Sequence, residues 1–274
     1  MSWRLIVTRS VYLLIGAAAG ASLYRMGLLD PAQLGPAFSR LADFGASLFP
    51  PQTDVLPTLA RAMLETVEIA FVGTLLGFLI SLPLAFLGTR TLFGPLVTSA
   101  MRLLIGSIRT IPSLLWGVVF VVGFGLGPAA GALGVAFYTV GYLGKLYYEA
   151  FEAVDPEVLE AVRSVGSNRP QLIAYAVLPE SANAIISQLL FMFEYNIRAS
   201  TIMGFVGAGG IGFYMLGYLQ LLQYQSLLTA LLLTFVVVMA VDYLSARLRS
   251  LILPSTQKAT GRAPLLAGLT ALWR

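Results

Sequence analysis

The chain has 274 residues, of which 58% are hydrophobic and 11% charged, and its net charge is +4. Soluble domains average roughly 45–50% apolar and about 25% charged residues, so this composition excludes a soluble globular protein. One helical crossing of a bilayer takes about 20 apolar residues. The length therefore allows about six transmembrane helices and no large soluble domain, and we expect an all-α polytopic membrane protein.

The chain contains no histidine and no cysteine, which excludes imidazole and thiolate metal ligands and the nucleophilic triads that use them. It also lacks the G-x-x-x-x-G-K-[ST] phosphate loop and the G-x-S-x-G elbow. We therefore expect no catalytic residues, no metal site and no cofactor in this chain, and no nucleic acid partner. A membrane-embedded enzyme is the alternative, but no clustered inward carboxylates support it.

Hydropathy predicts six spans along the chain, at residues 11–29, 63–87, 108–126, 129–147, 182–203 and 227–243. The first could also be a signal peptide, because Ala19-Gly20-Ala21 resembles a cleavage site. The apolar run continues past that point, which favours an uncleaved anchor.

Three segments between the spans have distinct compositions. Residues 31–61 are rich in proline, which is typical of an external connection, and residues 95–106 are expected to lie along the membrane interface. Residues 148–179 form the only long charged stretch inside the chain. The pattern divides the chain into an N-terminal helix with its external connection (1–60), a transmembrane domain (61–250) and a tail (251–274).

The distribution of positive charge predicts the orientation of the spans. Most of the 17 lysines and arginines, including Arg102 and Arg109, fall on the side of the two termini. By the positive-inside rule, both termini, the tail and the 148–179 loop are cytoplasmic, and residues 206–212 face outside. Glu65 and Glu68 are then expected near the outer end of the second span.

The 148–179 loop contains the signals of a short helix. Asp155 is suited to the N-cap, Pro156 to the first helical position and Glu157 to the first turn. Gly166 can stop this helix, and Ser167 or Asn168 can cap a second one.

One side of this predicted helix is apolar, with Val158, Leu159, Val162 and Val165. That stripe needs burial, although it lies outside the bilayer. It can pack against the ends of its own spans, or it can dock in a groove of a soluble partner. The composition favours neither alternative.

The run Glu160-Ala161-Val162-Arg163-Ser164-Val165-Gly166, followed by Leu178-Pro179, resembles the EAA loop of permease subunits of binding-protein-dependent ABC importers. Val162 stands for the second alanine of that motif and Ala176 for its isoleucine, and both replacements are apolar for apolar. The resemblance implies a coupling helix seated in a cleft of an ATP-binding subunit. The residues that it assigns to ATPase coupling are Glu160, Ala161, Arg163, Gly166, Leu178 and Pro179. Glu160 and Arg163 are expected to pair across that interface.

Residues 193–212, FEYNIRASTIMGFVGAGGIG, resemble the phosphonate permease branch of that superfamily, as does Arg109-Thr110-Ile111-Pro112. The resemblance covers roughly residues 60–250. It implies a type I ABC importer (MetI-like) permease fold in a bacterial inner membrane, and inward transport of a phosphonate, phosphite or hypophosphite. It also implies an ATPase dimer that holds ATP and Mg, a second permease copy, identical or paralogous, and an external substrate-binding protein.

Two alternatives to this function stay open. The first is a permease for methionine or another amino acid, because those relatives share the EAA loop and a similar glycine turn. The second is an ion-driven secondary transporter, against which the EAA-type loop argues, as does the absence of several buried acids in paired positions.

Polar residues in the fifth span are candidates for the translocation path: Glu194, Asn196, Arg198 and Thr201. A charge at mid-bilayer depth is costly and usually faces a partner or a watery path. Glu194 and Arg198 can neutralise each other one turn apart. Alternatively, Arg198, Asn196 and Thr201 line the path, where a positive charge favours an oxyanion.

A glycine-rich turn follows that span, with Gly207, Gly209, Gly210 and Gly212. Glycine turns can cradle phosphates with their backbone N–H groups. A nucleotide site is not favoured here, because no strand precedes the turn and no acid follows about 20 residues on. We expect the glycines to allow close packing or a bend at the outer mouth of the path, near where a binding protein docks.

Overall fold

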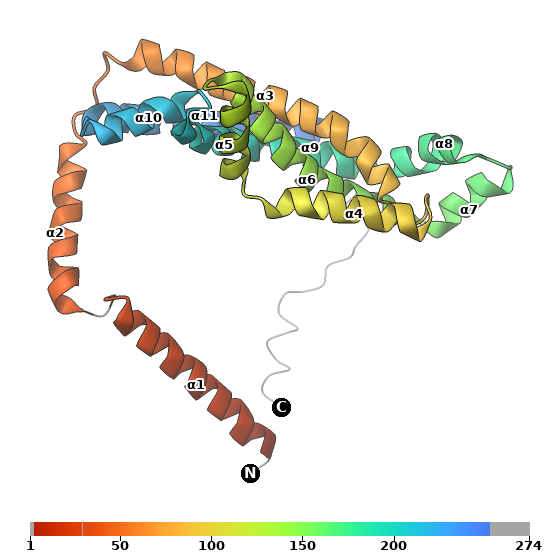
Figure 1. Ribbon diagram of the computed structural model, residues 1–274, viewed down its shortest axis with the longest axis horizontal. Coiled ribbons are helices and arrows are strands. Elements are labelled where there is room, and N and C mark those ends of the chain that lie inside the picture. Colours follow the sequence, from red (N-terminus) through yellow and green to blue (C-terminus); the bar gives the residue numbers. More distant parts are fainter. Residues whose placement is uncertain (1–2, 29, 253–274) are drawn as a thin grey trace.

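The computed structural model describes residues 3–28 and 30–252, and all regular elements within them are helical (Figure 1). The α-helices are α1 (Trp3–Arg25), α2 (Pro31–Ser47), α3 (Leu56–Leu87), α4 (Pro95–Thr110), α5 (Ser113–Phe124), α6 (Pro128–Glu152), α7 (Pro156–Ser164), α8 (Arg169–Leu172), α9 (Leu178–Met203), α10 (Ile211–Gln220) and α11 (Tyr224–Ile252). A π-helical turn, Ile173–Val177, joins α8 to α9, and a 3-10 turn, Gly204–Val206, follows α9. Apart from its first two residues, the predicted tail 251–274 lies outside the described residues.

Helix α6 is the centre of a bundle in which α3, α4, α5 and α9 all pack against it. Gly73 and Gly77 bring α3 close to α6, because a Cβ at either position would lie 2.5 Å from the Cβ of Val135 or of Thr139. Spacing of small residues by four is the usual device for close helix packing in membranes. Figure 1 shows α2 at one end of this bundle and α7 with α8 at the other.

Three helical runs in the described chain are long and apolar enough to cross a membrane, at 56–87, 169–206 and 224–251, and α4 with α5 would make a fourth as one bent span. The predicted number of six transmembrane helices is therefore not confirmed. Helix α6 is not among the three, although it has 25 residues. It contains glycines, tyrosines and Lys145, which lower its hydropathy, and its neighbours cover it.

The predicted span 108–126 is wrong as a single helix. The chain bends by 89° between α4 and α5, at Ile111, which is extended (φ −84°, ψ 121°). The cause is Pro112, since a residue before proline is disfavoured in the helical region. Helix α5 has 12 residues, or about 18 Å, which is too short to cross a hydrocarbon core of about 30 Å.

The proline-rich connection 31–61 is also more helical than expected. It contains α2, which begins where the Asp30 carboxylate accepts a hydrogen bond from the Ala32 N–H at 3.0 Å. Pro31 occupies the first helical turn, where its missing N–H costs nothing. Helix α3 begins at Leu56 rather than at residue 63, and α10 lies where no helix was predicted.

Candidate coupling surface and translocation site

The short helix predicted in the 148–179 loop is confirmed as α7. The Asp155 carboxylate accepts the Glu157 N–H at 2.9 Å. Gly166 ends the helix in the left-handed conformation, with φ of 78°. Asn168 then caps α8 by a reciprocal pair of hydrogen bonds with Gln171, at 2.9 and 3.0 Å.

The apolar stripe of α7 divides between two environments. Leu159 is buried in a cluster that includes Phe151 and Leu172, and Val158 and Val162 pack partly against the same cluster. Most of the stripe therefore packs against its own chain, which was one of the two alternatives left open by the sequence. Val165, at its end, is 81% exposed and is left for something outside this chain.

Arg163, which we expected to pair across the interface with the ATP-binding subunit, has a hydrogen-bond partner in its own chain. Its Nη2 donates a hydrogen bond to the Thr91 carbonyl oxygen at 2.8 Å, in the 88–94 connection between α3 and α4. Glu160 is exposed and has no ion pair within the described part of the chain. Arg163 therefore fixes α7 to the neighbouring connection, and Glu160 adds a negative charge, unpaired among the described residues, to the exposed surface.

The 88–94 connection is held from its other side as well. Arg102 Nη2 lies 2.5 Å from Glu152 Oε1, which also accepts the Arg90 N–H at 2.8 Å. Burial raises the pKa of the Glu152 carboxyl, but the Arg102 and Arg90 hydrogen bonds outweigh burial, so that the pKa is lowered from its usual value. The carboxylate stays charged and anchors the connection beside α7.

A hollow of about 490 Å³ lies beside the end of α7, bordered by Ala161, Val162, Val165, Gly166, Ser167, Gln171 and Tyr175. Tyr175 is 72% exposed, so apolar surface lies on two sides of the hollow. Leu178 and Pro179 belong to a different place, since Leu178 packs into the bundle and Pro179 lies in the first turn of α9. The six predicted coupling residues are thus divided between an exposed surface and the base of α9.

Helix α11 brings ion-pair partners to the fifth span that the sequence did not reveal. Glu194 Oε1 lies 2.6 Å from Arg249 Nη2, and Arg198 Nη1 lies 3.2 Å from Asp242 Oδ2. The expected mutual neutralisation of Glu194 and Arg198 is therefore wrong. Each is paired across the antiparallel contact between α9 and α11 instead.

Asn196 faces the opposite way, into the bundle, and is fully buried. Its Nδ2 donates hydrogen bonds to the hydroxyl oxygens of Thr74 and Thr139, both at 2.8 Å, and so ties α9 to α3 and α6. Thr201 donates to the Ile197 carbonyl oxygen at 3.1 Å. The four candidate path residues therefore do not share one surface of this chain, and their role in the path stays a prediction.

The glycine turn connects α9 to α10 through left-handed backbone at Gly207, Gly209 and Gly210, with φ of 85°, 83° and 75°. The Gly210 N–H donates to Glu65 Oε1 at 3.0 Å, and the Ile211 N–H to Thr66 Oγ1 at 2.8 Å. A carboxylate at a helix N-terminus is stabilising. This role of Glu65 was not predicted, although a glycine turn followed by the start of a helix indicates that an acceptor is needed there.

The backbone of this turn packs closely against neighbouring helices, which is the first of the two roles expected for its glycines; its position at the outer mouth stays a prediction. Gly210 meets α3 at residues 65 and 66, about 15 Å from the first residue of that helix. A Cβ on Gly212 would overlap the Thr201 carbonyl oxygen. The N–H donors that a phosphate would need are bound to α3, which argues against the nucleotide-binding alternative.

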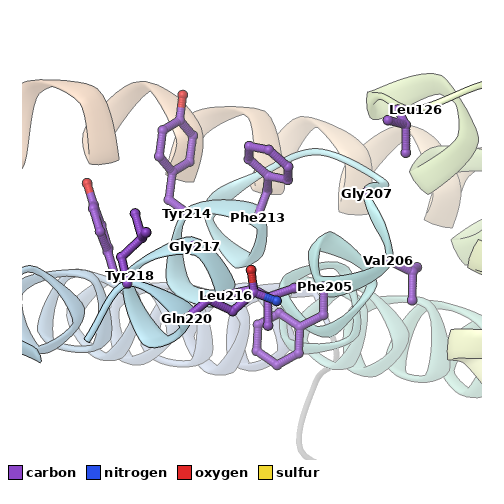
Figure 2. Close-up of a pocket in the computed structure, with 11 residues that line it drawn as sticks. Leu126, Phe205, Val206, Gly207, Phe213, Tyr214, Leu216, Gly217, Tyr218 and Gln220 are labelled. Carbon is purple, nitrogen blue, oxygen red and sulfur yellow. The ribbon is translucent and has the colours of Figure 1, made fainter. Parts of the chain in front are cut away.

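A cavity of about 480 Å³ borders the turn on the side of α10 (Figure 2). Phe205, Phe213, Tyr214 and Tyr218 contribute to its lining, and Leu126 faces them from the connection after α5. The lining is largely apolar and contains no charged residue, so its polar side-chain groups are those of Tyr214, Tyr218 and Gln220.

Residues 73–254 match the family of the binding-protein-dependent transport system inner membrane component. The chain belongs to this family. The matched segment begins within α3 and includes α7 and the glycine turn. This ABC transporter permease is a transport subunit, and its apolar helices and family make it a multi-pass membrane protein.

Two similar proteins illustrate the relationship. The phosphite transport system permease protein PtxC of Stutzerimonas stutzeri is 36% identical over 82% of each chain. The phosphate-import permease protein PhnE of Mycolicibacterium smegmatis is 33% identical over 89% of this chain and 53% of its own.

Solved structures share the fold. The inward facing MetNI methionine ABC transporter matches with a TM-score of 0.65 at 21% identity, covering 72% of this chain and 97% of the other. A bacterial alginate ABC transporter matches with a TM-score of 0.57 at 16% identity, covering 90% and 98%. The predicted MetI-like permease fold is confirmed.

The Glu194–Arg249 pair gives this permease a testable stability contribution. Replacing Arg249 by leucine leaves the Glu194 carboxylate, 9% exposed, without its partner, which should lower the free energy of unfolding by roughly 3 kcal/mol. Exchanging both residues (Glu194→Arg with Arg249→Glu) should restore most of the loss. Thermal unfolding of the solubilised protein measures both.

The control is Lys145→Leu, which breaks the more exposed Lys145–Glu149 pair and should cost about 0.5 kcal/mol. Equal losses in both single variants would contradict the assignment.

Proposed function

We propose that this chain is the permease subunit of an ABC importer that moves a phosphonate or a related phosphorus oxyanion, phosphite or hypophosphite, into the cytoplasm. ATP hydrolysis on a partner subunit drives the transport. The observation that carries the proposal is the 36% identity to a phosphite permease over 82% of both chains. The permease itself forms and breaks no covalent bond.

The partners follow from the same proposal. An ATPase dimer with ATP and Mg offers two clefts, and each chain has one α7, so two permease copies, identical or paralogous, complete the complex. Glu160, Ala161, Gly166 and Val165 lie on the exposed surface that one cleft would cover, and Val165 would there find the burial that its own chain does not give it. Both termini are cytoplasmic, and the binding protein docks on the opposite side.

Coupling in this proposal passes through the base of the bundle. Arg163 fixes α7 to the 88–94 connection, and the Arg102–Glu152 pair fixes that connection to α6. Movement of α7 with the ATPase therefore reaches α4, α6 and α9 together. Of the four path residues, Arg198 is best placed to meet an oxyanion, because it is still partly exposed although it is paired with Asp242. Glu194, Asn196 and Thr201 support the wall of the path.

The first alternative is a permease for methionine or another amino acid. It is favoured by the similarity in fold to the methionine transporter. A D-methionine permease of Pasteurella multocida, however, is only 26% identical over 54% of this chain, which is less than for the phosphite permease. The second alternative, an ion-driven carrier, requires transport without any ATPase.

Reconstitution tests the proposal directly. The complex of this permease with its ATPase is placed in liposomes, and ATP hydrolysis is measured with binding proteins loaded with phosphite, methylphosphonate or methionine. We expect several-fold stimulation by a phosphorus oxyanion and none by methionine. Stimulation by methionine alone, or uptake without the ATPase, would reject the proposal.

A further inference from the structure

The charge count placed Arg109 on the cytoplasmic side, but its backbone packs beside the middle of α6. A Cβ on Gly141 would lie 2.9 Å from the Arg109 backbone nitrogen and 3.0 Å from its Cα. Gly141 is near the middle of α6, which spans Pro128–Glu152, and so is about 20 Å from one end of that helix and about 17 Å from the other. Arg109 is therefore at the mid-depth of the bundle.

The charge of Arg109 has no acidic partner. Over residues 3–28 and 30–252, no carboxylate oxygen lies within 4.0 Å of its guanidinium, whereas Arg102, Arg198 and Arg249 are each paired. Arg109 is also exposed on the surface of the single chain. An unpaired cation at this depth is costly in lipid and is tolerated where it faces water or an anion.

A row of three tyrosines from two further helices begins at this arginine. The Arg109 guanidinium lies 6.0 Å from the Tyr142 ring centroid. The Tyr142 ring lies 4.7 Å from that of Tyr138, which in turn lies 5.6 Å from that of Tyr195. Tyr195 on α9 is 37% exposed, so the cluster reaches the surface at both of its ends. It offers a cation and the hydroxyls of Tyr142 and Tyr195, whereas Tyr138 is buried between them; the cluster contains no carboxylate.

The backbone beside Arg109 is broken as well. The helical hydrogen bonds stop at Ile111 and Pro112, between α4 and α5. Irregular backbone at membrane depth occurs where it is buried in protein or lines a watery cavity. Arg109 is exposed on the single chain, which fits the second of these situations, a surface that lines a watery cavity.

We propose that Arg109, with the hydroxyls of Tyr142 and Tyr195, binds a tetrahedral phosphorus oxyanion midway along the translocation path, and that Tyr138 positions the two other tyrosines. This inference rests on the proposed function. A guanidinium and hydroxyl groups are the donors that such an anion takes. Arg198 is a weaker attractor because Asp242 neutralises it. A zwitterionic amino acid would find no carboxylate for its ammonium group in the cluster, and the Arg109 charge would repel that group.

The test uses the full complex in proteoliposomes and measures uptake of radiolabelled phosphite together with ATP hydrolysis. Arg109→Gln should lower uptake about tenfold to a hundredfold, the loss of one charge-assisted interaction, while assembly and basal ATP hydrolysis are kept. Arg109→Lys should retain part of the uptake. Tyr142→Phe removes one hydroxyl and should lower uptake several-fold.

The matched control is Arg247→Gln. Arg247 also lies over a tyrosine, 5.7 Å from the Tyr243 ring centroid, but near the end of α11, and its loss should leave uptake unchanged. If wild type takes up phosphite and Arg109→Gln behaves like Arg247→Gln, the inference is wrong and the proposed function stands. If wild type takes up no phosphite, methylphosphonate or hypophosphite, both fail. Should Arg109→Gln not assemble, normal uptake by Tyr142→Phe and Arg109→Lys together would overturn the inference.

Discussion

Replacing Gly166 by arginine should abolish the stimulation of ATP hydrolysis by loaded binding protein, while the permease bundle stays folded. Gly166 has φ of 78°, a conformation that costs other residues roughly 1–2 kcal/mol. A Cβ there meets no atom within 4 Å, so the chain itself has room for the new side chain. The arginine would instead extend from the exposed surface beside Val165, which we propose is covered by the ATPase. Hydrolysis by the purified complex, with and without binding protein, measures the effect.

Gly166→Asn is the matched control, because asparagine adopts the left-handed conformation more readily than most residues. It should retain most of the stimulation. If both variants lose stimulation equally, backbone strain is responsible and not the surface. If Gly166→Arg keeps full stimulation, α7 is not the coupling element.

The second large effect is expected inside the bundle, where Gly77→Leu should prevent α3 from packing on α6. A Cβ at this position would lie 2.5 Å from the Thr139 Cβ and 2.9 Å from the Ala136 carbonyl oxygen. Because both atoms belong to the central helix, the contact cannot be relieved by turning a side chain. Overpacking of a core typically costs 1–3 kcal/mol, and a separation of two helices should cost at least roughly 3 kcal/mol. The yield of monodisperse protein and its Tm measure the loss.

Gly106→Leu provides the comparison for that variant. Gly106 is also inside a helix, α4, but a Cβ there meets nothing within 4 Å. The same substitution should therefore leave yield and Tm close to wild type. A similar loss in both variants would mean that leucine is harmful for a reason other than the α3–α6 contact.

The parts that the sequence predicted well are those whose information is local. The cap at Asp155 and the stop at Gly166 act over one helical turn, and α7 forms between them. The bend at Pro112 was local too, but we placed the start of the span before it, because apolar residues continue on both sides. Hydropathy is insensitive to a break that leaves the composition unchanged.

The contacts that could not be predicted from the sequence join residues that are far apart in the chain. Glu194 and Arg198 are one turn apart, and only the path of α11 decides that Arg249 and Asp242 pair with them instead. The acceptor for the Gly210 N–H is Glu65, on a helix that begins the bundle. The position of Arg109 beside the middle of α6 could not be predicted for the same reason. A charge count assigns each arginine to one side of the membrane and contains no information on which helix the arginine packs against.

The chain is helical without interruption from the coupling loop to the glycine turn. Residues 169–206 form a single helical run of 38 residues, about 57 Å long. If an ATPase moves α7, as proposed above, this continuous helix would carry the movement from the coupling loop to the glycine turn. The π-helical turn Ile173–Val177 interrupts the regular α-helical hydrogen bonding at the end of the run that contacts α7, so we expect the run to bend there rather than along α9.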